Sequence, residues 1–181
     1  DEIFLTPLNP AVTLCDETGC HHESSDGMLQ VDIPPGAVSP GDVVVVTATN
    51  FEHVEFLPSG ELPPGTWETY AFNLGGDSEV AFAQPITVKM RNYRGFGPAE
   101  EIPLGYWNQN TLEWEHVGFG IVDAVGEWVE MTVTHFSNYD CNYTVLVPPA
   151  GDPPGKPEEY TSAGGSGPCS ETQKACFIDY K

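Results

Sequence analysis

The sequence predicts an all-β protein, an antiparallel β-sandwich with short strands and an extended, cysteine-containing C-terminal tail. Glycine and proline are abundant, with 19 and 17 of the 181 residues, which is typical of a chain that turns often between short strands. No long stretch shows the apolar period of a helix. Residues 86–91 and 129–134 alternate between apolar and polar side chains, which predicts strands with one buried and one solvated face.

Each element follows from its local sequence. Residues 1–27 are interpreted as a leader with one or two strands. The clear strand pattern spans 28–33 and ends in the Pro- and Gly-containing turn 34–37. The β-branched run 43–47 is typical of a buried strand. Further strands are predicted at 52–57, 68–74, 85–91, 102–107, 112–117 and 127–134, and this spacing predicts a sandwich over residues 28–147.

At the end of the predicted strand 127–134, the alternation of inward and outward side chains does not suit the residues that follow. Val133 points inward, so the alternation would carry His135 inward and leave Phe136 outward. A large Phe side chain is not expected to stay in water. We therefore predict a bulge or bend near His135 that re-aims the residues after it.

Residues 148–168 are predicted to be a Pro/Gly-rich linker, and 169–181 a C-terminal tail segment. The first part of the linker, 148–157, has the proline content of a stiff extended chain, whereas 161–168 is rich in Gly and Ser. The tail contains the apolar run Phe177–Tyr180. We interpret this run either as a strand that adds to a sheet edge or as a frayed end.

The chain is strongly acidic, with 27 acidic residues against 6 basic residues and a formal net charge of −21. Such a field disfavours nucleic acid and anionic membrane surfaces as partners. No apolar run approaches the ~20 residues that a membrane span needs, so no membrane insertion is expected. The first residues lack a Met and a basic segment, and we interpret the chain as a mature or excised one.

Five cysteines lie at positions 15, 20, 141, 169 and 176. Close pairs in an acidic, strand-rich chain predict disulfides and an oxidising compartment, and hence a secreted, extracellular or cell-surface protein. Cys15 and Cys20 are expected to staple a hairpin turn, and Cys169 and Cys176 a part of the tail. For Cys141 three interpretations stay open: a free thiol, a bond to another chain, or replacement of a partner in one of the local pairs.

Four motifs follow one another in the chain. They are L-Q-V-D-I-P-P-G-A-V at 29–38, P-I-T-V at 85–88, I-P-L-G-Y-W with L-E-W-E-H-V at 102–107 and 112–117, and V-T-H-F-S-N-Y at 133–139. In this order they resemble the ZU-five domain family of β-sandwiches, which occurs in netrin receptors, ankyrins and death-domain scaffolds. Related modules occur in bacterial surface proteins of the Rhs/YD-repeat and teneurin-like kind.

This resemblance covers residues 28–147 and implies a rigid spacer, docking platform or plug rather than a substrate pocket. The chain departs from the family in three respects: the Cys15/Cys20 pair, the acidic bias and the cysteine-bearing tail. These departures argue for a secreted member rather than a cytosolic scaffold.

His135-Phe136-Ser137 is the first candidate for chemistry. Some members of the family that it resembles cleave themselves between the corresponding Phe and Ser. In this chain Ser137 Oγ would attack the Phe136 carbonyl and form an ester by an N-to-O shift, which water would then hydrolyse. His135 would serve as the base or polarise the carbonyl, and backbone strain would drive the shift. The alternative is structural: Phe136 anchors the core and His135 ends a strand.

The segment from Cys15 to His21 is the second candidate. It matches a covalent haem motif with four residues between the cysteines, in which Cys15 and Cys20 would form thioethers and His21 would bind the iron. The second axial ligand would come from one of the other histidines, His22, His53, His116 or His135. A hairpin disulfide explains the two cysteines without a cofactor. We expect no cofactor, with covalently bound haem c as the alternative.

Other motifs indicate little chemistry. Cys20, His21, His22 and Glu23 form a single cluster, whereas zinc usually takes two separated pairs, so no metal site is predicted. The sequence contains no Gly-x-Ser-x-Gly and no Gly-rich phosphate loop. Asn142-Tyr143-Thr144 is a glycosylation sequon if the source is eukaryotic.

These observations predict a function as well as a fold. We expect a secreted structural or interaction module, a subunit of an extracellular or cell-surface assembly such as a filament, and not an enzyme. Its partners are expected to be other protein chains, including copies of itself joined by strand or tail exchange. The alternatives are a c-type haem electron carrier that uses Cys15, Cys20 and His21, and a self-cleaving domain at Phe136-Ser137.

Overall fold

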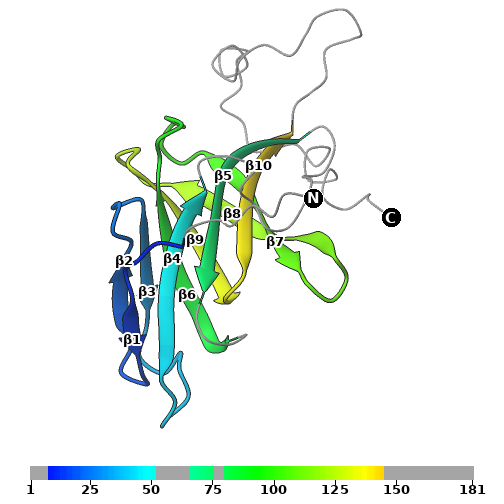
Figure 1. Ribbon diagram of the computed structural model, residues 1–181. Coiled ribbons are helices and arrows are strands. Elements are labelled where there is room, and N and C mark those ends of the chain that lie inside the picture. The colour runs from blue at the N-terminus through cyan, green and yellow to red at the C-terminus, as the bar shows by residue number, and fades with distance from the viewer. Residues whose placement is uncertain (1–7, 52–65, 76–79, 145–181) are drawn as a thin grey trace, which may run out of the picture.

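The computed structural model describes residues 8–51, 66–75 and 80–144. All regular structure in these residues is β, which confirms the predicted fold class (Figure 1). The strands are β1 (Thr13–Cys15), β2 (Cys20–Glu23), β3 (Leu29–Ile33), β4 (Val44–Phe51), β5 (Thr66–Gly75), β6 (Ala81–Arg91), β7 (Glu101–Asn108), β8 (Glu113–Val122), β9 (Trp128–His135) and β10 (Asn138–Thr144). None of the described residues lies in a helix long and apolar enough to cross a membrane.

The strands form one antiparallel sheet in the order β1-β4-β5-β10-β7-β8-β9-β6-β3-β2. The two strands at the ends of this order, β1 and β2, are consecutive in the sequence, so the sheet curls back until its ends meet. Figure 1 shows β4, β5 and β10 next to one another in one layer, with β2 and β3 beside them where the sheet closes. The result is a nearly closed antiparallel sandwich.

The two alternating segments of the sequence are neighbours in the sheet, as parts of β6 and β9. Their apolar residues face one another and are buried, in the pairs Ile86/Val133, Val88/Met131 and Met90/Val129. On the solvent side, Lys89 Nζ lies 2.8 Å from Glu130 Oε1. The Arg91 guanidinium lies 4.4 Å from the centre of the Trp128 ring. The predicted buried and solvated faces are therefore confirmed for both strands.

The opposite layer supplies larger side chains to the core. Tyr70, Phe72 and Leu74 of β5 are all fully buried. Phe72 stacks on Tyr139 of the neighbouring strand β10, with ring centroids 5.3 Å apart. The Tyr70 hydroxyl donates a 2.6 Å hydrogen bond to Asn92 Oδ1, so its polar end has a partner inside the protein.

The sequence patterns do not predict β10, although it is a central strand between β5 and β7. Its polar residues Asp140 and Asn142 are buried, and the Asn142 amide donates a hydrogen bond to a carboxylate oxygen of Asp140. Tyr139 and Cys141, which alternate with them, belong to the core. Both faces of this strand are therefore buried, whereas polar residues at every second position usually indicate a solvated face.

Other strands differ from the predictions at their ends. β6 begins at residue 81 instead of 85. Its pairing with β9 shifts register between Ala81 and Ile86, so Ala81 still pairs with His135. β8 extends to residue 122 instead of 117. The leader contributes β1 and β2 to the sheet, where β1 pairs with β4 and β2 with β3. The predicted strand 52–57, the linker 148–168 and the tail 169–181 lie outside the described residues.

Candidate functional site

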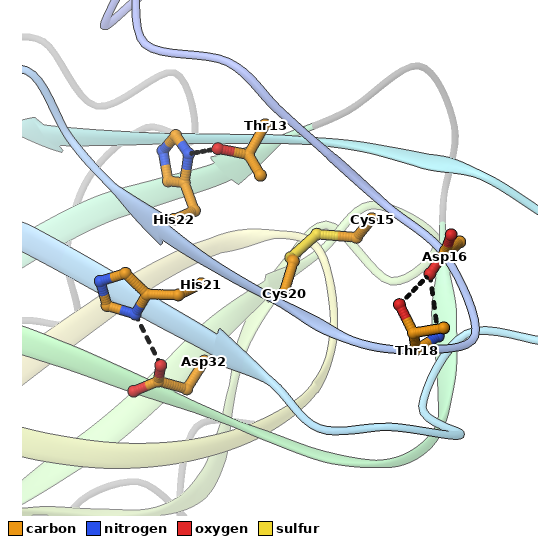
Figure 2. The surroundings of a disulfide bond; sticks show 8 residues. All are labelled: Thr13, Cys15, Asp16, Thr18, Cys20, His21, His22 and Asp32. Carbon is orange, nitrogen blue, oxygen red and sulfur yellow. Dashed lines mark hydrogen bonds and ion pairs between the residues drawn. A yellow bond between two sulfur atoms is a disulfide. The ribbon is translucent and has the colours of Figure 1, made fainter.

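The two end strands of the sheet meet along a seam that is held by side chains. In the described part of the chain, β1 pairs with β4 and β2 pairs with β3, and no backbone ladder joins β1 to β2. A disulfide links Cys15 at the end of β1 to Cys20 at the start of β2, with Cα atoms 5.4 Å apart (Figure 2). The predicted disulfide is confirmed, and it closes the sheet rather than a paired hairpin.

A hydrogen bond spans the seam one step further along. Thr13 Oγ1 lies 2.9 Å from His22 Nδ1, and Figure 2 shows the two side chains facing each other from β1 and β2. Both bridges link inward-facing positions, because Cys15 and His22 are each buried. The seam is therefore closed by one covalent and one hydrogen-bonded contact in the same antiparallel register.

The turn between the two cysteines is held by its own hydrogen bonds. Asp16 Oδ1 accepts bonds from the Thr18 hydroxyl at 2.6 Å and from the Thr18 N–H at 2.8 Å, which is an Asx-turn. These bonds, first of all the one from the Thr18 hydroxyl, lower the pKa of Asp16. The Gly36 N–H donates to the Glu17 carbonyl at 2.8 Å, so the turn is fixed to the connection after β3.

Gly19 occupies the tightest place in this turn. Its φ of +80° is in the left-handed region, and its N–H donates to the Asp16 carbonyl at 3.0 Å. A Cβ atom at this position would collide with the carbonyl oxygen of Ile33 and would lie 2.8 Å from the backbone nitrogen of Pro35. Only glycine fits here, because the turn lies directly on the backbone after β3.

His21 and His22 point to opposite faces of β2, as successive residues of a strand do. His21 is exposed, and its Nδ1 lies 2.6 Å from Asp32 Oδ1 on β3. His22 is buried, which lowers its pKa, and the charge of His21 lowers it further. Its Nε2 has no hydrogen-bond partner among the described residues.

These positions bear on the haem and metal interpretations of the sequence. The sulfur atoms of Cys15 and Cys20 are bonded to each other, whereas a thioether would need each of them separately. The cluster of Cys20, His21, His22 and Glu23 does not converge, because its side chains alternate between the two faces of β2. In residues 8–51, 66–75 and 80–144, no group of three or more His, Cys, Asp or Glu side chains could hold a metal ion.

His135, Phe136 and Ser137 form the crossover between β9 and β10, which lie on different sides of the sandwich. β9 ends at His135, and the Phe136 ring is buried in the core against Phe82, with ring centroids 5.0 Å apart. The prediction that Phe136 is not left in water is confirmed. The alternation of inward and outward side chains breaks here because the chain leaves its neighbour β6 after His135.

The backbone of this crossover is anchored on both sides. The Phe136 N–H donates to the Val80 carbonyl at 3.1 Å, and the Ser137 carbonyl accepts from the Leu74 N–H at 2.9 Å. The Tyr139 hydroxyl donates to the His135 carbonyl at 2.7 Å, a tyrosine-corner contact of the kind seen in Greek-key sandwiches.

The side chains of the predicted self-cleavage site have other partners. Ser137 Oγ donates to the Trp107 carbonyl at 3.2 Å, and the His135 ring lies edge-on against Tyr106, with centroids 4.6 Å apart. Among the described non-glycine residues, positive φ angles occur at Ala99 and Leu112, so the crossover is not in the left-handed region. The geometry fits a structural crossover, and self-cleavage stays the untested alternative.

Cys141 is the free cysteine of the described residues, and it is fully buried. Its Sγ lies 3.6 Å from Met131 Sδ, and burial raises the pKa of the thiol well above its usual range. It forms no disulfide within the described residues, and its pairing with another chain or with Cys169 or Cys176 stays open. Asn142 of the sequon is also buried, which keeps its amide away from a modifying enzyme in the folded protein.

An apolar surface beside the seam is the feature that the sequence interpretation misses. Leu8, Val12 and Leu14 are 62%, 59% and 68% exposed, Pro10 between them is exposed, and Val43, which directly precedes β4, is 62% exposed. Leu14 pairs with Val45, which places Leu14 and Val43 on the same outer face of β1 and β4. We name these five residues the outer stripe.

The sequence does contain a signal for the outer stripe. Apolar residues stand at positions 8, 10, 12 and 14, which is the alternation of a strand with one covered face. In the folded chain the alternate residues Thr13 and Cys15 turn inward instead. One face of β1 therefore packs against the core, and the other carries apolar side chains that face solvent in this chain.

We expect Gly19→Ala to destabilise the fold more than Gly41→Ala does. Both residues have a left-handed φ, at +80° and +86°, but only Gly19 faces a neighbouring backbone. The left-handed penalty of about 1–2 kcal/mol is common to both variants. The collision should add ~1–3 kcal/mol in Gly19→Ala alone. Urea unfolding of the oxidised proteins measures this difference, and equal losses would contradict the close approach.

We expect the free energy of unfolding to fall as the pH drops below 6.5, partly because of His22. Burial lowers the pKa of folded His22 from 6.5, so the unfolded chain takes up a proton that the folded chain resists. Above this pH the effect vanishes. Urea titrations across the acidic range should show a shallower decline for His22→Gln than for wild type. Identical slopes would assign the decline to other groups.

We expect the chain to remain intact at Phe136-Ser137, because the hydroxyl that would attack is engaged by Trp107. Wild type and Ser137→Ala should each run as one full-length band on a reducing gel. Loss of the hydrogen bond should cost Ser137→Ala about 0.5–1.5 kcal/mol of stability. Two fragments in wild type that are absent from Ser137→Ala would demonstrate self-cleavage instead.

A comparison with models of known protein families finds no match to this sequence, and neither does a comparison with curated proteins. The resemblance to ZU-five domains therefore rests on the four motifs and stays a prediction. The candidate site of this chain has to be argued from its own residues.

Proposed function

We propose that this chain is a structural and protein-interaction module of an assembly outside the cell. The observation that carries this proposal is the outer stripe, where apolar side chains at alternate positions of one segment face solvent. Single exposed apolar residues are ordinary on protein surfaces. Several exposed apolar residues gathered along one segment are typical of a site that another protein chain covers.

The seam supports the structural part of the proposal. A disulfide that closes a short loop stabilises the fold by an amount on the order of 2 kcal/mol in the chain-entropy description. Here it also keeps the two ends of the sheet together, so β1 presents the outer stripe on a fixed support. Such a bond persists in oxidising compartments, which supports a location outside the cell.

The charge of the chain supports a protein partner. Residues 1–88 contain neither Lys nor Arg, so the half of the sequence that carries the outer stripe is acidic throughout. A field of this sign repels nucleic acid and anionic lipid and attracts basic protein surfaces. A docking platform is also what the resemblance to ZU-five domains implies.

We expect the outer stripe to be a contact surface in the cells that produce this protein. A photoreactive residue introduced as Leu14→p-benzoyl-phenylalanine should form covalent protein adducts on illumination, which gel electrophoresis and mass spectrometry detect. Val125, which is 75% exposed in the turn between β8 and β9, offers a matched control position. Adducts at 14 that are absent at 125 support the proposal, and equal or absent adducts at both positions refute it.

A further inference from the structure

The margin of the outer stripe is negatively charged. Asp16 and Glu17 follow Leu14 directly, and Asp42 precedes Val43. The hydrogen bonds of Thr18 lower the pKa of Asp16, so this carboxylate is ionised at neutral pH. A segment that fits this surface needs apolar side chains with positive charge beside them.

The basic residues of the chain are few, which narrows the search for such a segment. They are Lys89, Arg91, Arg94, Lys156, Lys174 and Lys181. The first three lie on β6 and in the turn that follows it, where Lys89 contacts Glu130, Arg91 contacts Glu127, and Arg94 Nε donates to the Thr69 carbonyl. None of these three adjoins a free apolar run.

Segment 174–181 has the required composition. Lys174 and Lys181 frame the apolar residues Phe177, Ile178 and Tyr180, and the segment carries two lysines against a single aspartate. It is therefore locally positive in a chain whose net charge is −21. Its length also fits, because the outer stripe from residue 8 to 14 spans about 20 Å and eight extended residues span about 25 Å.

We propose that the outer stripe binds segment 174–181 of a second copy of this chain. This inference rests on the proposed function, since it names the partner for the same surface. Ile178 and Tyr180 lie on one face of an extended segment and would cover Val12, Leu14 and Val43, and one flanking lysine would lie near the acidic margin.

The charge distribution favours this arrangement over contact between two outer stripes. A symmetric contact of stripe on stripe would bring together two surfaces of the same negative sign, and like charges in an interface are costly. A contact of stripe with segment 174–181 joins unlike surfaces, so every copy offers one donor segment and one acceptor surface.

The sequence between the sandwich and segment 174–181 favours a second copy over the same chain. The prolines of 148–157 predict a stiff spacer, which extends by about 3.1 Å per residue. Such a spacer directly after the sandwich would lead the start of the tail away from its own domain, and the Gly- and Ser-rich stretch 161–168 that follows would let the segment reach a neighbouring copy.

The test uses the purified full chain with Leu14→p-benzoyl-phenylalanine, mixed in equal amounts as ¹⁵N-labelled and unlabelled protein. Illumination and proteolysis should yield peptides that join position 14 to residues 174–181, and half of them should pair one labelled with one unlabelled peptide. The same residue introduced at Val125 should yield none of these products. Mixed-isotope pairs demonstrate that the segment comes from a second copy.

Variants in the tail provide the matched comparison. We expect the double substitution Ile178→Ser and Tyr180→Ser to lower the yield of these products at least ~10-fold, since it removes the apolar side chains of the contact face. Tyr160→Ser, in the linker, should leave the yield unchanged. An equal yield in both variants would overturn the assignment of the segment.

The remaining outcomes separate this inference from the proposed function. Products with a single isotope only would place the segment on its own chain and overturn the second copy as partner. Adducts in the producing cells between position 14 and a different protein, without products to 174–181, would overturn this inference and leave the proposed function standing. Absence of adducts at position 14 in both experiments would overturn both.

Discussion

The bond between Cys15 and Cys20 is the constraint on which the closed sandwich depends. Every other neighbouring pair of strands in the ten-stranded sheet is joined by a backbone ladder, whereas the end strands β1 and β2 are held by side chains. Strands at the end of a sheet expose unpaired N–H and C=O groups that attract foreign strands. The disulfide, the Thr13–His22 hydrogen bond and the Gly19 turn keep these edges facing each other, and so keep the core beneath them covered.

Strands of the sandwich are predictable from the sequence where one of their faces is solvated. β6 and β9 follow directly from their alternating residues, and β3 and β4 from their apolar and β-branched runs. β10 is not predictable in this way, because Asp140 and Asn142 are buried on its second face. The turn of the chain at Phe136 could be predicted from its phase. Its cause, a crossover to the other side of the sandwich, depends on the sheet order, which no local pattern contains.

The candidate site, too, could be predicted from the sequence only in part. The disulfide partners were identifiable from their spacing, but their role as the closure of the sheet requires the pairing of β1 with β4 and β2 with β3. The outer stripe had a signal in the apolar residues from Leu8 to Leu14. Local alternation shows only that one face differs from the other. The face of β1 that meets the core is the one whose residues contact His22 and Cys20 across the seam. That contact depends on how β1 and β2 lie in the sheet, which the local sequence does not show.

The buried position of Cys141 has a consequence for how the chain acquires its disulfide. Thiol–disulfide exchange needs a thiolate that can reach the sulfur under attack. Inside the core, beside Met131, the Cys141 thiol is protonated and out of reach of any oxidant or exchange partner. Before the core forms, it is accessible to exchange, although the short separation of Cys15 and Cys20 favours their own pairing over a bond to Cys141. Collapse of the core therefore withdraws Cys141 from thiol exchange and protects the bond between Cys15 and Cys20 from attack by it.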